Sequence, residues 1–581
     1  MNRYKHSMMG LPMMRLLGVV VVLSLTCMTG QALADEAPQR RAVDALFAKY
    51  DRSSGAGVAV GVYQAGQLRY AGGFGMAELE NNIAITPDTV FPLSSVSKQF
   101  TAFAILLLSR EGKVDLDADV RTYLPYVPDF GQRITVRHLL LHTSGLRDVW
   151  GMFWLAGIDA AQGGQSLALK MVQRQRALNF APGSEHQYSN TGYVLLAEIV
   201  KAVSGQSLRA FTTARIFKPL RMDHTLFLDD ATELVPRRAT SYCWKYFYCQ
   251  NEAQAWRREL GGTDVMGATG MYSTIGDLAR WAGNFTNPVV GDRALIDEFT
   301  RLGRLDQGAP INYGFGLWHR TLAGHEAVMH DGANEGFRSV FVVVPKENFS
   351  VAILANTIMG VEELAAGIVS IYLGEKRQEP ASLPKVVAPD AATVAALVGH
   401  YQRIGQVHLV FERQGRQLVQ RTSADEPPVA LLFRADGTFD AGVEQRGNGQ
   451  YFRPVRDTSG QVVAVDQGTT GINPFTDAGV PMRYLRVPAL ERGKLDLHEF
   501  AGDYRSEELD TTLRLVVENG TLMLESFRLP TSMALQPIYP DAFQGKRYFT
   551  QIVMQRGADG HVAALLASSN SDRNVRFERV K

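Results

Sequence analysis

Hydrophobic and polar positions between residues 41 and 374 alternate between strand-like and helix-like patterns. Residues 57–63 and 67–73 are short β runs around a Gln-Ala-Gly turn, which is typical of a hairpin. Residues 339–345 and 350–356 repeat this arrangement around Lys-Glu-Asn. Because hairpins stand near both ends of the segment, we expect one antiparallel sheet built from both ends, with helices packed on it.

Three helices are predicted between the two hairpins. Residues 99–111 and 190–203 are rich in apolar side chains, and a glycine follows each segment closely, which is a common signal for the end of a helix. The sequence Thr-Ile-Gly-Asp at 274–277 has the pattern of a capping box and predicts that a helix runs over 277–285.

The pattern changes after residue 375. Residues 376–392 are rich in proline and lack apolar periodicity, which predicts a linker. Beyond it, Leu-Val-Gly-His-Tyr at 397–401 matches Phe-Ala-Gly-Asp-Tyr at 500–504, and alternating apolar residues that lead into a glycine turn follow each copy. The repeat predicts two β domains of barrel or sandwich type, over 393–488 and 489–581, and a single large β domain is the alternative.

Residues 1–34 have the pattern of a secretory signal. A positively charged start is followed by an apolar stretch over 16–25 and by Ala-Leu-Ala before two acidic residues. This stretch is shorter than the ~20 apolar residues that span a bilayer, so we expect its removal and a periplasmic or secreted protein, with a retained anchor as the alternative. No later segment is apolar enough over sufficient length to predict a transmembrane helix.

Composition excludes some classes of function. A hydrophobic fraction of 46% and a charged fraction of 20% over 581 residues are those of a globular protein with several domains. The formal net charge of +1 gives no sign of a nucleic-acid partner. The sequence has no metal-ligand spacing, so we predict no metal and no cofactor. In an exported protein Cys243 and Cys249 would suit a small disulfide loop, and two free thiols are the alternative.

The strongest local signal for chemistry is Ser95-Val96-Ser97-Lys98, at the start of the predicted helix 99–111. Residues three apart share a helix face, so the Ser95 hydroxyl and the Lys98 amine can meet. A serine needs a base to become a good nucleophile, and a lysine can be that base when burial lowers its pKa from about 10.4 toward neutrality. A capped surface helix is the alternative. Another Ser-x-x-Lys, at 382–385, lies in the predicted linker and is set aside.

Two further motifs carry candidate residues. Tyr188-Ser189-Asn190 is the only Tyr-x-Asn in the sequence and lies where a loop meets a predicted helix. Tyr188 could relay a proton between Ser95 and a leaving group, and Asn190 could donate to a substrate amide. A buried tyrosine beside a helix-capping asparagine is the alternative.

The last motif, His330-Asp331-Gly332-Ala333, precedes the strand predicted over 339–345. Gly332 would let a substrate backbone lie against the chain, and His330 would point into the cleft, with a structural histidine as the alternative. The acidic Asp331 and Glu335 could attract a substrate ammonium group.

In this order the three motifs resemble those of the penicillin-recognising serine hydrolases, which include class C β-lactamases, D-alanyl-D-alanine carboxypeptidases, D-aminopeptidases and related esterases. Val-Arg-His-Leu-Leu-Leu-His-Thr-Ser-Gly-Leu at 136–146 and Gly-Met-Tyr-Ser-Thr at 270–274 support the resemblance. It implies an α/β (α+β) catalytic domain over 35–375, in which helices flank an antiparallel sheet, followed by the two small all-β, barrel-like domains.

The resemblance also implies roles for the candidate residues. Ser95 would be the acylated nucleophile, Lys98 and Tyr188 would transfer protons, and Asn190 would bind substrate, together with His330, Gly332 and Ala333. The backbone N–H groups of Ser95 and Ala333 would form the oxyanion hole, in which one donor is typically worth ~10²–10³ in rate.

One departure from the family pattern changes the expected substrate. β-Lactamases usually carry Lys-Thr-Gly at the third motif, whereas this chain has His330-Asp331-Gly332 and no Lys-x-Gly anywhere. The ammonium that would hold a substrate carboxylate is therefore missing, and the histidine form is more similar to D-aminopeptidases and certain D-alanyl carboxypeptidases. We expect a peptidase that acts on D-amino-acid peptides or peptidoglycan fragments and is inefficient toward β-lactams.

Three other functions stay open. A carboxylesterase on small acyl esters would use the same residues with a more apolar pocket, and Trp150, Phe153 and Trp154 on a predicted lid would suit it. A weak β-lactamase is the second alternative. The third is a non-catalytic peptidoglycan-binding protein, which would retain only the pocket. The β domains would restrict access to the cleft, or bind the cell wall or a partner. The sequence leaves the oligomeric state undetermined.

Overall fold

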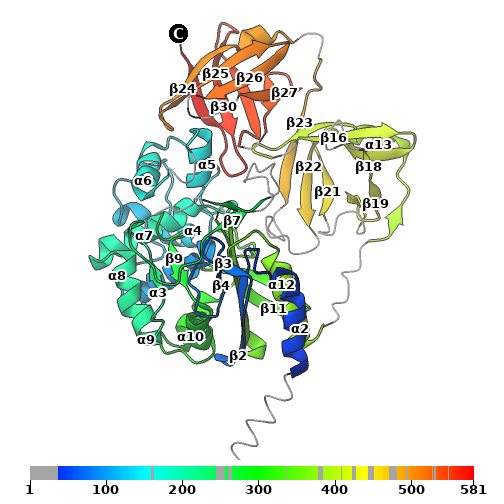
Figure 1. The fold of residues 1–581 in the computed structure, drawn as a ribbon. Helices are drawn as coiled ribbons and strands as arrows, with labels where there is room; N and C mark the ends of the chain where they lie inside the picture. Colours follow the sequence, from blue (N-terminus) through cyan, green and yellow to red (C-terminus); the bar gives the residue numbers. More distant parts are fainter. Residues whose placement is uncertain are drawn as a thin grey trace, which may run out of the picture.

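A six-stranded antiparallel sheet lies at the centre of the first part of the chain, and two β domains follow it in sequence (Figure 1). The computed structural model describes residues 37–158, 163–243, 255–259, 265–334, 336–376, 384–406, 408–421, 427–442, 450–469, 481–491, 495–526, 528, 532–546 and 548–580. The predicted signal over 1–34 and Cys249 lie outside the described residues, whereas Cys243 is disulfide-bonded.

The central sheet has the strand order β10-β11-β12-β13-β1-β2. Its first and last segments meet where β1 pairs with β13, with Val58 opposite Ala355. This confirms the expected antiparallel sheet with strands from both ends of the segment. The strands are β1 (Val58–Gln64), β2 (Gln67–Phe74), β10 (Trp318–Leu322), β11 (His325–Asn334), β12 (Phe337–Val344) and β13 (Phe349–Ala355).

The predicted helices form close to their expected bounds, as α3, α7 and α10. Thr274 caps α10 by accepting a hydrogen bond from the Asp277 N–H. The helices of this part are α2 (Ala37–Phe47), α3 (Lys98–Arg110), α4 (Val136–Leu140), α5 (Val149–Leu155), α6 (Gln165–Arg174), α7 (Asn190–Ser204), α8 (Leu208–Thr212), α9 (Lys218–Leu220), α10 (Ile275–Thr286), α11 (Arg293–Phe299) and α12 (Val361–Leu373).

Helices cover both faces of the sheet, and the alternation along β1 assigns its side chains to two cores. Ala59 and Tyr63 point into the core that contains α3, α7 and α10. Val58, Val60 and Val62 point into the core that contains α2 and α12. Every residue of α3 from its first to Leu108 is buried. An apolar helix of this kind packs inside a core, so its polar first residue, Lys98, is buried as well.

Among the described residues of this part, three small sheets accompany the central one. The three-stranded sheet β5-β9-β6 fixes the segment before α3, because the Leu93 N–H donates to the Met271 carbonyl. The strands are β3 (Met76–Glu78), β4 (Ile83–Ala84), β5 (Phe91–Pro92), β6 (Leu226–Phe227), β7 (Tyr242–Cys243), β8 (Arg257–Arg258) and β9 (Met271–Ser273).

The first β domain is an open ten-stranded sheet with the order β14-β19-β20-β21-β22-β23-β15-β16-β17-β18. Part of the predicted linker belongs to it, because β14 pairs with β19 and α13 (Ala391–Leu397) packs in its core. Its strands are β14 (Val386–Val387), β15 (Gly399–Gln402), β16 (Leu409–Gln414), β17 (Gln417–Arg421), β18 (Val429–Ala430), β19 (Leu432–Arg434), β20 (Phe439–Asp440), β21 (Gln450–Arg456), β22 (Val462–Thr469) and β23 (Met482–Val487).

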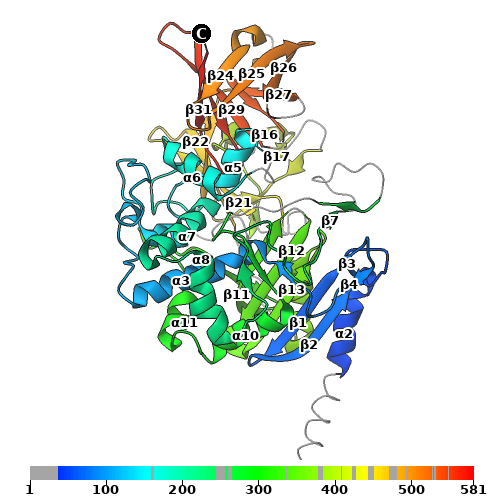
Figure 2. The same cartoon turned by 60° about the vertical axis from the view of Figure 1, so that its left-hand side comes forward.

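The second β domain is a closed barrel, in which β24 pairs with β31. In Figure 2 it stands over α5 and α6. Its strands are β24 (Gly502–Ser506), β25 (Thr511–Glu518), β26 (Thr521–Ser526), β27 (Met533–Tyr539), β28 (Ala542–Gln544), β29 (Gln551–Arg556), β30 (Val562–Ser568) and β31 (Val575–Arg579).

The sequence repeat has a structural counterpart in the two β domains. The Tyr401 hydroxyl donates to the carbonyl four residues earlier at 2.9 Å, and Tyr504 makes the same bond at 2.8 Å. Arg486 and Arg579 lie over these two rings, at 5.8 and 5.9 Å from the ring centroids. The repeat therefore marks two related β domains. In the described part of the chain, helices are too short or too polar to cross a membrane.

Candidate active site

Ser95 lies on a 3₁₀ turn, Ser94–Ser97, that leads directly into α3. Ser94 has φ +49°, in the left-handed region that costs a non-glycine residue strain. Ser97 stabilises the turn, because its hydroxyl donates to the Ser94 carbonyl at 2.6 Å. Ser95 alone in this turn is half-buried rather than buried. The turn thus leaves the Ser95 hydroxyl partly accessible, while its neighbours are buried.

Lys98 is the first residue of α3 and is completely buried. Side chains at i and i+3 eclipse in a 3₁₀ turn, so its amine lies 3.2 Å from the Ser95 Oγ. The Nζ also donates to the Asn190 Oδ1 and to the Ala268 carbonyl, both at 2.8 Å. Its three donor positions therefore point at three fixed acceptors.

Burial lowers the pKa of Lys98 to about 7, and the charges of Asp148 and Asp331 oppose this fall. A buried ammonium loses hydration, which favours the neutral amine. Near neutral pH a substantial share of the amine is therefore unprotonated and can accept a proton. Asp148 and the Ala268 carbonyl were not found from the sequence, because a loop aspartate and a backbone oxygen carry no local motif.

Tyr188 lies beside Lys98, whose Nζ is 4.9 Å from the tyrosine ring centroid. Burial raises the pKa of Tyr188 well above its usual value of 10, and an interaction with Ser95 acts in the opposite direction. Among the described residues, no group makes a well-formed hydrogen bond with the buried Tyr188 hydroxyl. A protonated phenol next to Ser95 is thus available to donate to an incoming group.

Asn190 begins α7, and both ends of its side-chain amide are occupied. The Oδ1 accepts from Lys98, whereas the Nδ2 and the backbone N–H of Asn190 donate to the Asp148 Oδ2 at 2.9 and 2.5 Å. The Nδ2 carries a second hydrogen, which stays free for the expected donation to a substrate amide. The observed contacts make Asn190 a link between Asp148 and Lys98.

His330 is buried among aromatic rings instead of pointing into an open cleft. Its Nε2 lies 3.1 Å from the Tyr313 hydroxyl, and its ring centroid lies 6.0 Å from that of Tyr188. Burial, with the nearby Lys98 charge, lowers the pKa of His330 to about 3. The histidine is therefore neutral near pH 7. Its motif lies on β11 and, as expected, precedes the strand predicted over 339–345, which is β12.

Gly332 brings β11 against the turn that carries Ser95. A Cβ at this position would lie 2.3 Å from the Ser339 Oγ and 2.4 Å from the Leu93 carbonyl oxygen. The chain itself therefore fills the space expected for a substrate backbone on that side of the glycine. Ala333, the next residue along β11, is exposed.

We expect Gly332→Ala to damage both the site and the fold. The added methyl group must push β11 away from a backbone oxygen, and overpacking of this kind costs about 1–3 kcal/mol. Thermal unfolding should show a lower Tm, and labelling of Ser95 by a fluorophosphonate should slow. Gly276→Ala is the control, because a Cβ there meets nothing closer than 3.8 Å. Equal behaviour of the two variants would contradict this packing role.

The aromatic residues of the predicted lid join α5 to the barrel instead. Phe153 is fully buried in the core shared by α5 and the barrel. Trp154 stacks on Tyr548, with centroids 4.9 Å apart and an interplanar angle of 19°. Trp150 packs against the same core. The lid interpretation is wrong, because these side chains are part of a domain interface.

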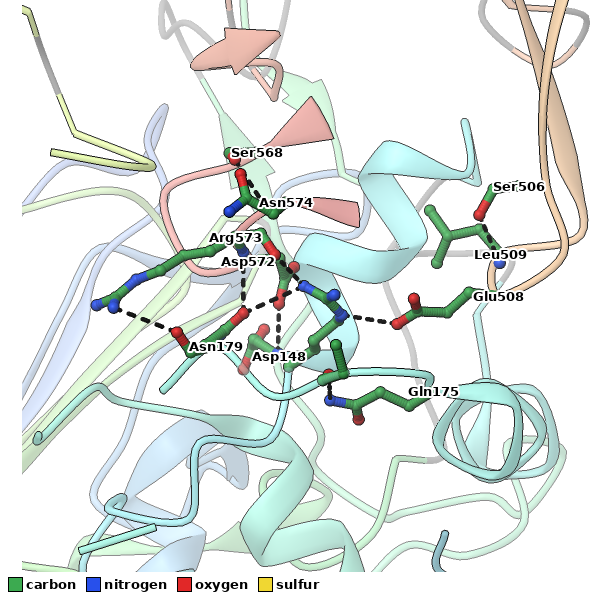
Figure 3. A network of polar contacts seen from close by, with 12 residues as sticks. Asp148, Gln175, Asn179, Ser506, Glu508, Leu509, Ser568, Asp572, Arg573 and Asn574 are labelled. Atoms are coloured by element: carbon green, nitrogen blue, oxygen red, sulfur yellow. Dashed lines mark hydrogen bonds and ion pairs between the residues drawn. The ribbon is translucent and has the colours of Figure 1, made fainter. Parts of the chain in front are cut away.

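The barrel brings the loop between β30 and β31 next to Asp148, which the sequence did not indicate (Figure 3). The Asp572 Oδ1 accepts a hydrogen bond from the Asp148 N–H at 2.6 Å. Arg147 donates to the Glu508 Oε1 at 2.6 Å, and both side chains are buried. Asn179 donates to the Ser571 carbonyl at 2.8 Å. Polar groups of the barrel therefore contact the segment that carries Asp148.

The described residues contain no group of three histidine, cysteine, aspartate or glutamate side chains arranged to hold a metal ion. The acidic pair expected to attract a substrate ammonium is only partly described. The Asp331 side chain is 42% exposed, and Glu335 lies outside the described residues.

Comparison with known proteins gives independent evidence about the relatives of this chain. The sequence matches the sequence model of the Beta-lactamase family over residues 43–367. A D-aminopeptidase of Brucella anthropi is 25% identical over 544 residues, which cover 91% of this chain and 96% of the relative. A D-aminopeptidase of Gluconobacter oxydans is 28% identical over 335 residues, which cover 57% of this chain and 61% of the relative. The crystal structure of SurE, 23% identical, aligns with a TM-score of 0.54 over 78% of this chain and 100% of its own, and thus shares the fold.

Proposed function

Because the chain belongs to the Beta-lactamase family of serine hydrolases and has D-aminopeptidases among its relatives, we propose that it is a peptidase that acts on D-amino-acid peptides or peptidoglycan fragments through Ser95. The observation that carries the proposal is the buried Lys98 amine, 3.2 Å from the Ser95 hydroxyl and with a pKa of about 7. The similarity to the Brucella D-aminopeptidase over almost the whole of both chains supports the choice of substrate class.

In the proposed reaction, neutral Lys98 takes the proton of the Ser95 hydroxyl as the Oγ attacks the scissile carbonyl carbon. The N–H groups of Ser95 and Ala333 stabilise the oxyanion of the tetrahedral intermediate. Tyr188 donates its proton to the leaving amine as the C–N bond breaks, and it regains a proton from the Lys98 ammonium. Water then attacks the acyl carbon and gives up a proton to Lys98. Lys98 passes this proton to the Ser95 Oγ as the acyl C–O bond breaks, which releases the acid and restores the hydroxyl.

The neutral state of His330 supports the expected weakness toward β-lactams. With a pKa of about 3, this side chain supplies no positive charge at the position where β-lactamases carry lysine. A substrate carboxylate would therefore lack that partner. Export stays part of the proposal, because peptidoglycan lies outside the cytoplasmic membrane. The esterase alternative loses its main support, because the aromatic residues of α5 pack against the barrel.

The proposal is tested on purified protein with chromogenic substrates, a covalent probe and peptidoglycan. We expect turnover of a D-alanine p-nitroanilide, slower turnover of the L-form, and little turnover of a chromogenic cephalosporin. A fluorophosphonate should label Ser95, as located by mass spectrometry, and Ser95→Ala should lose both labelling and turnover. Ester turnover without D-anilide turnover would favour the esterase. Binding to peptidoglycan without turnover of any probe would favour a non-catalytic protein.

A further inference from the structure

We propose that Asp572 of the C-terminal barrel is a positioning residue for Lys98, acting through Asp148 and Asn190. The barrel would then be part of the reactive apparatus of Ser95 and not only a neighbour of the cleft. This inference rests on the proposed function, since it assigns Lys98 the role of base. It requires a continuous path of contacts between the barrel and the Lys98 amine, and the structure contains one.

The path begins at a fully buried carboxyl group. Asp572 is 0% exposed, and its Oδ1 accepts the Asp148 N–H at 2.6 Å. The hydroxyls of Ser569 and Ser571 lie 3.3 and 3.4 Å from its Oδ2, which holds the carboxyl group within its own loop. Removing the acceptor would leave a buried backbone N–H without a partner, which is costly in a protein interior.

The path continues through Asp148, which uses both carboxylate oxygens. The Oδ1 accepts the Trp150 N–H at 2.9 Å and so caps α5. The Oδ2 accepts hydrogen bonds from the backbone N–H and the Nδ2 of Asn190, whose Oδ1 in turn accepts from Lys98 at 2.8 Å. A shift of Asp148 would therefore move the amide that orients the Lys98 amine toward Ser95.

Gly151 shows how closely Asp572 is fitted to α5. A Cβ at Gly151 would lie only 1.8 Å from the Asp572 Oδ2. The glycine thus leaves room for the carboxyl group against the first turn of the helix. This contact offers a second way to displace Asp572, from the opposite side of the interface and without a change in the barrel.

The charges around Asp572 agree with a positioning role. Arg147 and Asp148 are the charged neighbours that act on this carboxyl group, and burial together with the Asp148 charge raises the pKa of Asp572 to about 8. The group is therefore largely neutral near pH 7, so an asparagine preserves both its charge and its acceptor oxygen. An alanine removes the acceptor.

The test is the saturation kinetics of Ser95 labelling by a fluorophosphonate in the full-length protein. We expect Asp572→Ala to lower the limiting rate of acylation about tenfold or more, because small misplacements of reacting groups have effects of this size, while half-saturation by the probe stays unchanged. Gly151→Ala should have the same effect, whereas Asp572→Asn should acylate at close to the wild-type rate. The limiting rate is measured per reactive molecule, so loss of folded protein alone does not change it.

Tyr548→Ala is the matched control, since it removes the stacking contact with Trp154 in the same interface and leaves the Asp572–Asp148 hydrogen bond in place. We expect its acylation rate to stay close to that of the wild type. A normal rate in Asp572→Ala and Gly151→Ala would overturn the proposal, and so would an equal loss in Tyr548→Ala, which would assign the effect to docking of the barrel. Failure of the probe to label wild-type Ser95 would instead contradict the proposed nucleophile.

Discussion

We expect Lys98→Met to lower kcat/KM for a D-alanine p-nitroanilide about 10²–10⁴-fold, which is the usual contribution of a general base. Methionine fills the buried space of the lysine stem but cannot accept a proton from Ser95. The rate is measured with purified variant at saturating and limiting substrate. Lys98→Arg is the informative companion, because it keeps a positive charge without a usable base, and it should lose as much activity as Lys98→Met.

The pH dependence of the wild type follows from the same residue. The pKa of Lys98 is about 7, and the neutral amine is the reactive form. Below pH 7 the amine becomes protonated, so kcat/KM should fall about tenfold for each pH unit, and it should level off above pH 8. This acidic limb should be absent in Lys98→Met. Its persistence there would assign the titration, and the role of base, to another group.

Tyr188→Phe separates the two proton-transfer roles. Tyr188 stays protonated near pH 7, because burial raises its pKa well above 10, so it is suited to donate rather than to accept. Loss of its hydroxyl should slow turnover of an anilide, which needs a proton on the leaving amine, more than turnover of a p-nitrophenyl ester, which does not. Equal losses for both substrates would contradict the donor role.

Local patterns predicted those parts of the fold whose causes are local. The hairpin of β1 and β2 follows from two alternating runs around a turn, and α3 from a continuous apolar segment that ends near a glycine. The Ser95–Lys98 contact joins two residues of one helical turn, so a spacing of three residues sufficed to predict it. Whatever is fixed within one or two turns of chain can be predicted in this way.

The parts that sequence reasoning missed are fixed by distant pairs. Asp148 and Asp572 are 424 positions apart. Asp148 directly precedes a helix and Asp572 lies in a loop, so the local sequence indicates only a helix cap for the first and a turn for the second. His330 was expected in a cleft because its motif was considered without the aromatic residues that pack around it from other strands and loops. Tertiary packing decides such environments, and no local pattern records it.

The second large effect is expected at Glu508, whose buried ion pair with Arg147 joins the barrel to the segment that precedes α5. The two side chains are 5% and 1% exposed, and the Arg147 Nε donates to the Glu508 Oε1 at 2.6 Å. In Glu508→Ala the guanidinium stays buried without its counter-ion, and breaking a buried pair in this way costs about 3–5 kcal/mol. Hydrogen exchange of the α5 amides should report this loss as a lower free energy of local opening.

Glu507→Ala is a neighbouring control that separates burial from charge. Glu507 pairs with Arg176 at 3.6 Å, but the two side chains are 81% and 73% exposed, so its loss should change the opening free energy by less than about 1 kcal/mol. Replacing the buried pair by Arg147→Met with Glu508→Leu should recover most of the stability that Glu508→Ala loses, because no unpaired charge then remains in the interface. If hydrogen exchange of the α5 amides were equally fast in Glu508→Ala and Glu507→Ala, the Arg147–Glu508 pair would not be what holds the barrel on the catalytic domain.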